Sequence, residues 1–412
     1  MIDAPTAAPG IRERPMRLRK LGPFLVLGQF AWAVPGAASA TLLAALLAAV
    51  DPAHKVGVFT AYSVAGAVTS AIGTVAGGLC SDRTRSQFGR RSPWLLGSAL
   101  LAALALAASG LTANLVAIGC CYAIFQLGVG VWVAALSALI PDHVPTGSVG
   151  AASAFAGFGY LLGQTAGGVL AGLLVTRASA GLVLVPWIMA LAGVLITIVL
   201  RGPDNRADAR PAGPRPALRD LVPPGSRDFW LAFAGRFLFI LAILMITVFQ
   251  LYLLTDYLHL PTAEAGRMVG LATLLVGVLA VVAVIVAGLL SDRLHRRKPF
   301  VIGAPLLLAV GLAPLLAAPS LTTDLVFFAI VGITLGCYLS VDQALMIAVL
   351  PDQETAARDL GVLSIGSTLP GVVAPIVGGL LAWLSGYLAI FVVALVLAVI
   401  AAIAIVGIRS VR

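Results

Sequence analysis

The chain has 412 residues, of which 60% are hydrophobic and only 10% are charged, and its mean hydropathy is +1.05. Soluble domains carry about 25% charged residues, so this composition excludes a soluble globular protein and indicates a chain that lies in lipid. Each membrane span needs about 20 mostly apolar residues, and irregular backbone cannot face lipid, so we expect a bundle of helices.

Charged and reactive side chains narrow the function further. The net charge is +9, but the basic residues line one membrane face, which indicates lipid rather than nucleic acid as the partner. The cysteines lie in or beside apolar runs, which argues against a disulfide framework or a thiolate metal site. The histidines fall in predicted loops, which argues against a histidine metal cluster. These residues are Cys80, Cys120, Cys121, Cys337, His54, His143, His259 and His295. We expect no metal and no cofactor.

Residues 1–20 are polar and basic, and the apolar run that follows is too long for a cleavable signal peptide, so they are interpreted as a cytoplasmic tail. Twelve apolar runs follow, at residues 21–49, 57–80, 93–111, 114–140, 150–176, 181–200, 229–254, 265–290, 299–318, 323–350, 360–384 and 387–408. We therefore predict an all-α polytopic membrane protein with 12 transmembrane helices.

The basic residues predict the orientation of these spans. If successive loops alternate between the two sides, 22 of the 26 basic residues fall on one side. Lys55, Arg177 and Arg267 fall on the other side, and Arg236 lies inside span seven. Because cytoplasmic loops are rich in lysine and arginine, both termini are predicted to be cytoplasmic in a multi-pass protein of the cell membrane.

A linker divides the chain into halves. Residues 201–228 are rich in proline and arginine and have no apolar period, which is typical of a linker. It separates an N-terminal half at 21–200 from a C-terminal half at 229–408, and residues 409–412 form a short tail. Each half holds six predicted spans.

A charged loop after span two has a counterpart in the second half. It contains Gly77-Gly78-Leu79-Cys80-Ser81-Asp82-Arg83, followed by Phe88-Gly89-Arg90-Arg91-Ser92-Pro93-Trp94. A weaker copy, Gly288-Leu289-Leu290-Ser291-Asp292-Arg293, lies 210 residues further on, and Ile140-Pro141-Asp142 matches Leu350-Pro351-Asp352 at the same interval. Repeated halves of six spans are typical of secondary transporters.

The Gly-x-x-x-Asp-Arg pattern and its basic run resemble the signature loop of the major facilitator superfamily, and the fuller form resembles its sucrose-transporter-like and glycoside/pentoside/hexuronide symporter branch. The resemblance implies two pseudo-symmetric six-helix halves around a central site. It also implies that the loop closes the cytoplasmic side against the opposite half, with Asp82 near Asp359-Leu360-Gly361 and Asp292 near the start of span five.

We therefore predict a cytoplasmic gate. Its members are Asp82, Arg83, Gly89, Arg90, Arg91, Asp142, Asp292, Arg293 and Asp352. The alternative is that the basic residues of the loop only anchor the topology.

Polar residues inside the spans fall on single helical faces. Spans one, four, seven and ten line the cavity in the fold that the chain resembles. The predicted substrate cavity contains Gln29, Trp32, Gln126, Tyr160, Gln164, Thr247, Gln250, Tyr338 and Gln343. Each glutamine could instead hydrogen-bond a neighbouring helix.

Two charged residues, Arg236 and Asp342, are predicted to lie deep within the spans. Each costs about 2.5–3.5 kcal/mol to place there, which indicates a function or a pair. A conformational change that separates them would release or take up a proton, so both are predicted proton-coupling residues. The alternatives are a static pair or direct contact with substrate.

Together these features predict a secondary active transporter, acting as a monomer, whose partners are a small polar solute, protons and the lipid bilayer. A sugar or glycoside moved by proton symport is favoured. Spans two and four lack the aspartates through which melibiose-type relatives bind sodium. Proton-coupled efflux of a drug-like or metabolite solute is the alternative. An enzyme is not expected, because no histidine is buried, Asp342 is the only deep acid and there is no phosphate loop.

Overall fold

The computed structural model describes residues 18–144, 148–199, 226–294, 298–348, 362–363 and 365–408, without the side chains of 18, 292, 342–345 and 347–348. All regular secondary structure in these residues is helical. Most of the predicted linker, the start of span eleven and both chain ends lie outside the described residues.

The first half of the described chain contains eight α-helices and one short 3₁₀ turn. These are α1 (Leu18–Val50), α2 (Lys55–Arg83), α3 (Ser92–Ser109), α4 (Leu115–Ser137), α5 (Leu139–His143), α6 (Val149–Leu174), η2 (Val175–Arg177), α7 (Ala178–Leu184) and α8 (Trp187–Val199). Asn114 caps α4, because its side chain accepts a hydrogen bond from the backbone of Ala117 at 3.1 Å.

The second half is also helical where it is described. Its elements are α9 (Arg227–Thr247), α10 (Gln250–Tyr252), the π-helical turn η4 (Leu253–Tyr257), α11 (Thr262–Leu294), α12 (Lys298–Ala317), α13 (Leu321–Ala348), α15 (Pro370–Ser385) and α16 (Tyr387–Val406). Prolines inside α1, α12 and α15 are tolerated because neighbouring helices can satisfy the freed backbone groups.

Eleven stretches of the described chain are long and apolar enough to cross a membrane. The longest, Val149–Val199, has 51 residues and contains two of the predicted spans, because η2 and α7 divide it. Span six was predicted as one helix over 181–200 but is broken at Val185–Pro186, between α7 and α8. Proline has no backbone N–H to continue the helix, which explains the interruption.

Span seven also differs from the prediction. It was expected to run as one helix over 229–254, but α9 ends at Thr247. The Thr247 hydroxyl donates to the carbonyl of Ile243 at 3.1 Å, a side-chain contact that bends helices. The chain then continues through α10 and η4, and π turns of this kind often accompany functional sites.

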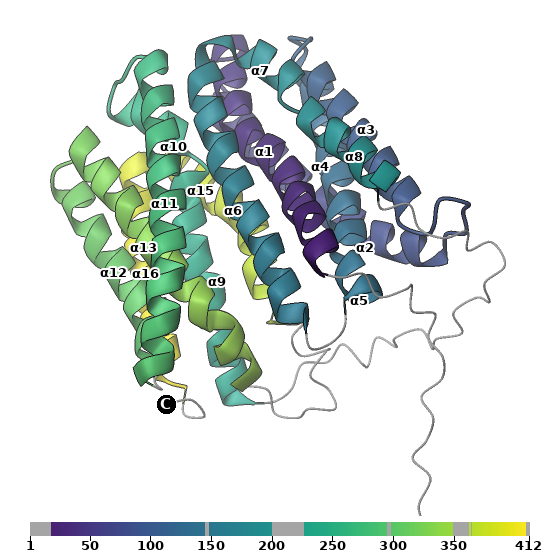
Figure 1. Ribbon diagram of the computed structural model, residues 1–412. Coiled ribbons are helices and arrows are strands. Elements are labelled where there is room, and N and C mark those ends of the chain that lie inside the picture. Colours follow the sequence, from purple (N-terminus) through teal and green to yellow (C-terminus); the bar gives the residue numbers. More distant parts are fainter. Residues whose placement is uncertain are drawn as a thin grey trace, which may run out of the picture.

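The helices form two groups that lie side by side (Figure 1). The first group packs α1 on α6 and α2 on α4, and the second packs α11 on α13 and α9 on α16. The groups meet where α6 packs on α11 and where α2 packs on α15. We call the end that holds the start of α1 and the end of α16 the proximal end. The end that holds α7 and α10 is the distal end.

Glycines let the helices of one group approach closely. A Cβ atom on Gly73 of α2 would lie closer than 3.0 Å to the carbonyl oxygen of Leu127 in α4, and one on Gly130 of α4 would lie equally close to the backbone of Ser70. Because backbone cannot move aside as a flexible side chain can, these positions require glycine. Small residues of this kind drive helix association in lipid.

A matched pair in α2 tests this packing. Gly73→Ala should lower the free energy of unfolding by about 1–3 kcal/mol, because the added methyl group overpacks the α2–α4 contact. Gly78→Ala should be neutral or slightly stabilising, because no described atom lies within 4 Å of that Cβ and alanine favours helix. Thermal unfolding midpoints in one detergent would measure both, and equal midpoints would contradict the packing argument.

Candidate functional site

Four of the predicted cavity residues lie together across α1 and α6. The Trp32 indole N–H donates to Oε1 of Gln29 at 2.7 Å. The Trp32 ring lies 5.4 Å from the ring of Tyr160, measured between centroids. The Tyr160 hydroxyl accepts a hydrogen bond from Nε2 of Gln164 at 3.0 Å. We call these four residues the Trp32 group, which offers two aromatic rings and two carboxamides.

Gln126 lies elsewhere in the same half. Its Nε2 donates to the hydroxyl of Tyr122 at 2.9 Å, and both side chains would contact a Cβ placed on Gly66 of α2. The residue therefore packs at the α2–α4 interface, and no hydrogen bond links it to the Trp32 group in the described chain. This position fits the alternative that a glutamine bonds within the bundle.

The predicted cavity residues of the second half do not form one group in the described chain. Tyr338 is 2% exposed and its ring lies 4.6 Å from that of Phe239, so it packs between α13 and α9. Gln250 is 7% exposed, and its Nε2 is a buried donor without a hydrogen-bond partner in the described chain. The side chain of Gln343 lies outside the described residues.

Arg236 reaches the predicted region of α13. Its guanidinium Nη1 donates to the sulfur of Met346, which lies one helical turn after Asp342 in α13. The Asp342 side chain itself is outside the described residues. Arg236 therefore contacts α13 one turn from Asp342, and the proposed pair remains a prediction.

The charged loop after α2 folds back onto its own half. Nη2 of Arg91 lies 2.7 Å from Oδ1 of Asp82, and Nε of Arg91 lies 3.0 Å from Oδ2 of Asp142. Arg90 also pairs with Asp142, and Nη1 of Arg91 donates to the Ser81 hydroxyl at 2.6 Å. One arginine thus joins the end of α2 to α5.

The backbone of this loop explains how the arginines reach these partners. Gly89 has φ of 82°, the left-handed region that favours glycine. The Trp94 indole N–H donates to the Thr84 hydroxyl at 2.6 Å, which ties the two ends of the loop together. Pro93 occupies the first turn of α3, where the missing N–H costs nothing.

A second charged cluster joins the two halves at the distal end. Nζ of Lys55, at the start of α2, lies 2.7 Å from Oδ1 of Asp256 in η4. Oδ2 of Asp256 accepts a hydrogen bond from the Tyr387 hydroxyl of α16 at 2.8 Å. The Lys55 ammonium also lies 5.2 Å from the ring centroid of Tyr252. We call these four residues the distal latch.

Sequence analysis did not identify the distal latch. The available signal was Lys55, one of only three basic residues on the side predicted to be extracytoplasmic. Its partner Asp256 lies 201 residues away, in a π turn that the helical pattern did not reveal. Tyr252 also contacts the first half, since its hydroxyl donates to the Ala44 carbonyl at 3.0 Å.

Glycines close the same end. A Cβ on Gly172 of α6 would lie closer than 3.0 Å to the carbonyl of Gly266 in α11, and one on Gly379 of α15 would lie equally close to Thr60 of α2. In each of these four helices, the glycines nearest the proximal end have more room. A Cβ added to any of them would have no described atom within 4 Å; these glycines are Gly78, Gly150, Gly157, Gly288 and Gly371. In the described chain, the close glycine contacts between α6 and α11 therefore run from the distal end, at Gly266, to the middle of α11, at Gly277.

The sequence matches the Major Facilitator Superfamily over residues 58–283 and 254–411. The chain belongs to the major facilitator superfamily. No curated protein matches it in sequence.

Solved structures share the fold of this superfamily member at low sequence identity. A bacterial homologue of the human lysosomal transporter Spinster, in an inward-facing and occupied conformation, has a TM-score of 0.70 and 14% identity, with 95% of this chain and 97% of that chain covered. A POT family transporter in complex with a thioalcohol-conjugated peptide has a TM-score of 0.72 and 14% identity, with 94% and 95% covered. A D-xylose–proton symporter has a TM-score of 0.68 and 16% identity, with 95% and 98% covered. The predicted twelve-helix fold class is confirmed.

The gate predicted for this superfamily member is described only in part. Asp82, Arg90, Arg91 and Asp142 meet at the proximal end, whereas Arg83 and Arg293 are exposed. The expected partner of Asp82 at residues 359–361, the Asp292 side chain and Asp352 lie outside the described residues. The observed partner of Asp82 is Arg91 of its own loop, and closure against the opposite half remains a prediction.

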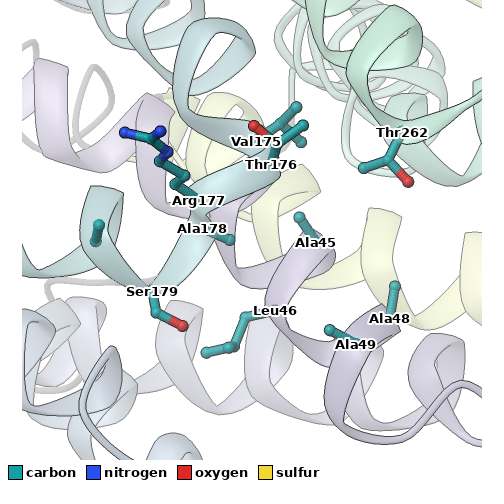
Figure 2. Close-up of a pocket in the computed structure, with 11 residues that line it drawn as sticks. Ala45, Leu46, Ala48, Ala49, Val175, Thr176, Arg177, Ala178, Ser179 and Thr262 are labelled. Carbon is teal, nitrogen blue, oxygen red and sulfur yellow. The ribbon is translucent and has the colours of Figure 1, made fainter.

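A cavity of about 620 Å³ lies between the end of α1, the η2–α7 segment and the start of α11 (Figure 2). Its lining is mostly small and apolar, with alanines of α1 facing Val175 and Ala178, and Thr262 lies across from them. None of the predicted cavity residues lines it. It is therefore a depression at the distal junction of the halves, separate from the Trp32 group.

The two acids of the proximal cluster should differ in their contribution to stability. The Asp142 and Arg91 side chains are 9% and 8% exposed, so Asp142→Ala leaves buried guanidinium groups short of a partner and should cost about 3–5 kcal/mol. The Asp82 side chain is 55% exposed, so Asp82→Ala should cost about 0–1 kcal/mol. Thermal unfolding of both purified variants measures the difference, and equal losses would show that Asp142 is not the structural anchor.

Proposed function

We propose that the protein is a secondary active transporter that moves a small polar solute by alternating access, with a sugar or glycoside as solute and proton symport as the coupling mode. The observation that carries alternating access is the asymmetry between the two ends of the bundle. Described contacts between the halves, both the distal latch and the glycine approaches, gather toward the distal end. A transporter that is closed at one end needs contacts between its halves there, and these contacts must separate when the other end closes.

The Trp32 group supports a sugar as solute. Its two aromatic rings offer apolar faces to the carbon skeleton of a sugar, and its carboxamides can bond hydroxyl groups. The similar D-xylose–proton symporter transports a molecule of this class. These residues come from α1 and α6, which are continuous helices, so the group is held on rigid elements.

The second candidate is proton-coupled efflux of a drug-like or metabolite solute. The Trp32 group favours it to a lesser degree, since two aromatic rings without a described charge also suit an apolar solute. Direction relative to the proton gradient separates the two candidates. Membership of a transporter superfamily supports transport rather than catalysis in either case.

The remaining features of the proposal follow from charge and composition. We place the protein in the cell membrane with both termini cytoplasmic, which makes the distal end extracytoplasmic. The proposed partners are the solute, protons and lipid, and the proposed active unit is a monomer.

Proteoliposome transport tests the function. Purified protein is reconstituted, and a panel of labelled pentoses, hexoses and glycosides is offered with and without an inward proton gradient. Symport predicts accumulation that requires the gradient and that a protonophore abolishes. Solute leaving the vesicles in exchange for entering protons would favour efflux, and no flux of any solute above protein-free vesicles would count against both candidates.

The distal latch should bias the conformational equilibrium. Lys55→Glu and Asp256→Lys each replace an attraction with a repulsion, and loss of this charge-assisted contact should favour opening of the distal end by about 1.5–3 kcal/mol. The double variant Lys55→Glu/Asp256→Lys should recover closure. The measurement is the alkylation rate of a Thr60→Cys reporter, at the α2–α15 contact, in protein whose four native cysteines are replaced by serine.

A matched control distinguishes the ion pair from general disruption. Tyr387→Phe removes one hydrogen bond to Asp256 and keeps the ion pair, so it should raise the alkylation rate less than Lys55→Glu does. If the Lys55→Glu/Asp256→Lys protein is alkylated as fast as the faster of the two single variants, the Lys55–Asp256 ion pair does not close the distal end.

Asp342 is proposed to couple protons to transport through Arg236. Asp342→Asn should then abolish proton-driven accumulation of the solute identified above while preserving its exchange across the membrane. A static pair predicts loss of folded protein instead, because an orphaned buried charge costs about 3–5 kcal/mol. Flux assays on stable Asp342→Asn protein decide between them, and accumulation with wild-type pH dependence would exclude the coupling role.

A further inference from the structure

A single acid stands out within the membrane-spanning helices of the described chain. Asp324 lies in the first turn of α13 and is 5% exposed, the one acid among the buried polar residues. Its Oδ2 is a buried oxygen without a hydrogen-bond partner in the described residues. Sequence analysis did not single it out, because it falls at the end of a predicted span, where acids are common.

The carboxyl group is not needed to cap the helix. Ser320 and Thr323 satisfy the start of α13 reciprocally: the Ser320 backbone N–H donates to the Thr323 hydroxyl at 2.9 Å, and the Thr323 N–H donates to the Ser320 hydroxyl at 3.2 Å. Such a pair of reciprocal hydrogen bonds gives partners to backbone N–H groups that have none within the first turn of a helix. Asp324 therefore has no capping contact that would explain an acid at this position.

No ion pair compensates for its burial either. The helices packed against α13 are α9, α11 and α12. Their charged residues are Arg227, Asp228 and Arg236 in α9, Glu264, Arg267, Asp292 and Arg293 in α11, and Lys298 in α12. None of them forms an ion pair with Asp324 in the described chain. An ionised carboxylate left without a partner in an apolar environment is costly, whereas a protonated one loses much less on burial.

The position of Asp324 connects it to the closing of the distal end. Asp324 lies one turn from the exposed residues that precede α13, and α13 packs on α11. The distal half of α11 is the surface that Gly172 of α6 approaches. Separation of α6 from α11 at this end would expose the side of α11 that faces the first half, next to the helix on which Asp324 lies, and would bring water closer to the start of α13.

Asp324 also shares a helical face with Asp342. The two acids are 18 residues apart, which is five full turns at 3.6 residues per turn and about 27 Å at 1.5 Å per residue. One face of α13 thus carries an acid in its first turn and a second acid five turns further along. Between them on this face lie Phe328, Val331 and Tyr338, all buried, and the two acids are too far apart to exchange a proton directly.

We propose that Asp324 is a second proton-binding site of the transport cycle, which exchanges its proton with water at the distal end. The carboxyl group holds the proton while this end is closed. When the halves separate there, water reaches the carboxyl group: the O–H bond breaks, the proton passes to water and a hydrated carboxylate remains, and a proton taken from the same water restores the O–H bond before this end closes. This proposal rests on the proposed function of alternating access, and it adds a site that serves the side opposite the termini.

Infrared spectroscopy tests the proposal without any solute. The carbonyl band of a protonated carboxylic acid is compared between wild-type protein and Asp324→Asn at neutral pH, in detergent. We expect one such band to disappear in Asp324→Asn, to persist in Asp324→Glu and to persist in Asp342→Asn. Asparagine has the shape of the protonated acid, so the variant should fold, and its thermal unfolding midpoint checks this.

The distal-latch variant Lys55→Glu tests whether protonation depends on the opening of the distal end. In Lys55→Glu the same band should weaken in proportion to the opened fraction, which alkylation of the Thr60→Cys reporter measures. A spectrum in which Asp324→Asn leaves every carboxylic acid band in place would overturn the proposal, and so would a band that stays constant while the distal end opens. Because no solute is involved, failure of the flux assay alone would count against the proposed function and not against this protonation site.

Discussion

The absence of water in the bilayer core is the constraint on which this structure depends. Polar side chains within the helices have to find partners in the protein, and three glutamines of the first half do so on their own helices. Gln29 bonds Trp32, Gln126 bonds Tyr122 and Gln164 bonds Tyr160, each with an aromatic residue three or four positions away. A glutamine paired within its own helix needs no partner on a neighbour, so the helix can move against that neighbour without leaving an amide unsatisfied.

The same constraint separates the permanent contacts from the breakable ones. Within each half, glycines bring backbones together in contacts such as that between α2 and α4, which no side-chain rearrangement can relax. Between the halves, the strongest polar contact is a lysine–aspartate pair whose side chains are 19% and 25% exposed. Partial exposure lets water reach either partner as the pair separates. The described polar contact between the halves is thus more exposed than the glycine contacts within each half, and the proposed alternating access would open it.

The proximal and distal clusters use charge in different ways. Arg91 is buried and bonds three side chains, those of Ser81, Asp82 and Asp142, so it holds one half together. Lys55 has one carboxylate partner and reaches it across the two halves. The proximal cluster therefore lies within one half, and the distal cluster connects the two halves. Asp324 adds a third arrangement, a buried acid with one oxygen that has no hydrogen-bond partner in the described residues, which is the basis of the proposed protonation site.

The sequence by itself determined the class, the number of crossings and the elements on which polar residues lie. Composition and apolar run length suffice for this because lipid permits only helices of sufficient length. It also singled out Arg236, which contacts Met346 of α13, while its pairing with Asp342 stays a prediction. The signature loop was recognisable because its glycine and arginines are required by a local turn.

Only the tertiary structure decided which side chains meet. The breaks at Val185–Pro186 and after Thr247 have local causes, a proline and a threonine hydroxyl bonded within its own helix, but the partners of side chains on different helices do not. The distal latch joins residues about 200 positions apart, and whether Oδ2 of Asp324 finds a partner among the described residues depends on which groups the surrounding helices offer. Helical periodicity assigns a residue to a face, but the partner on that face is set by how two halves dock, and docking depends on the shapes of both surfaces together.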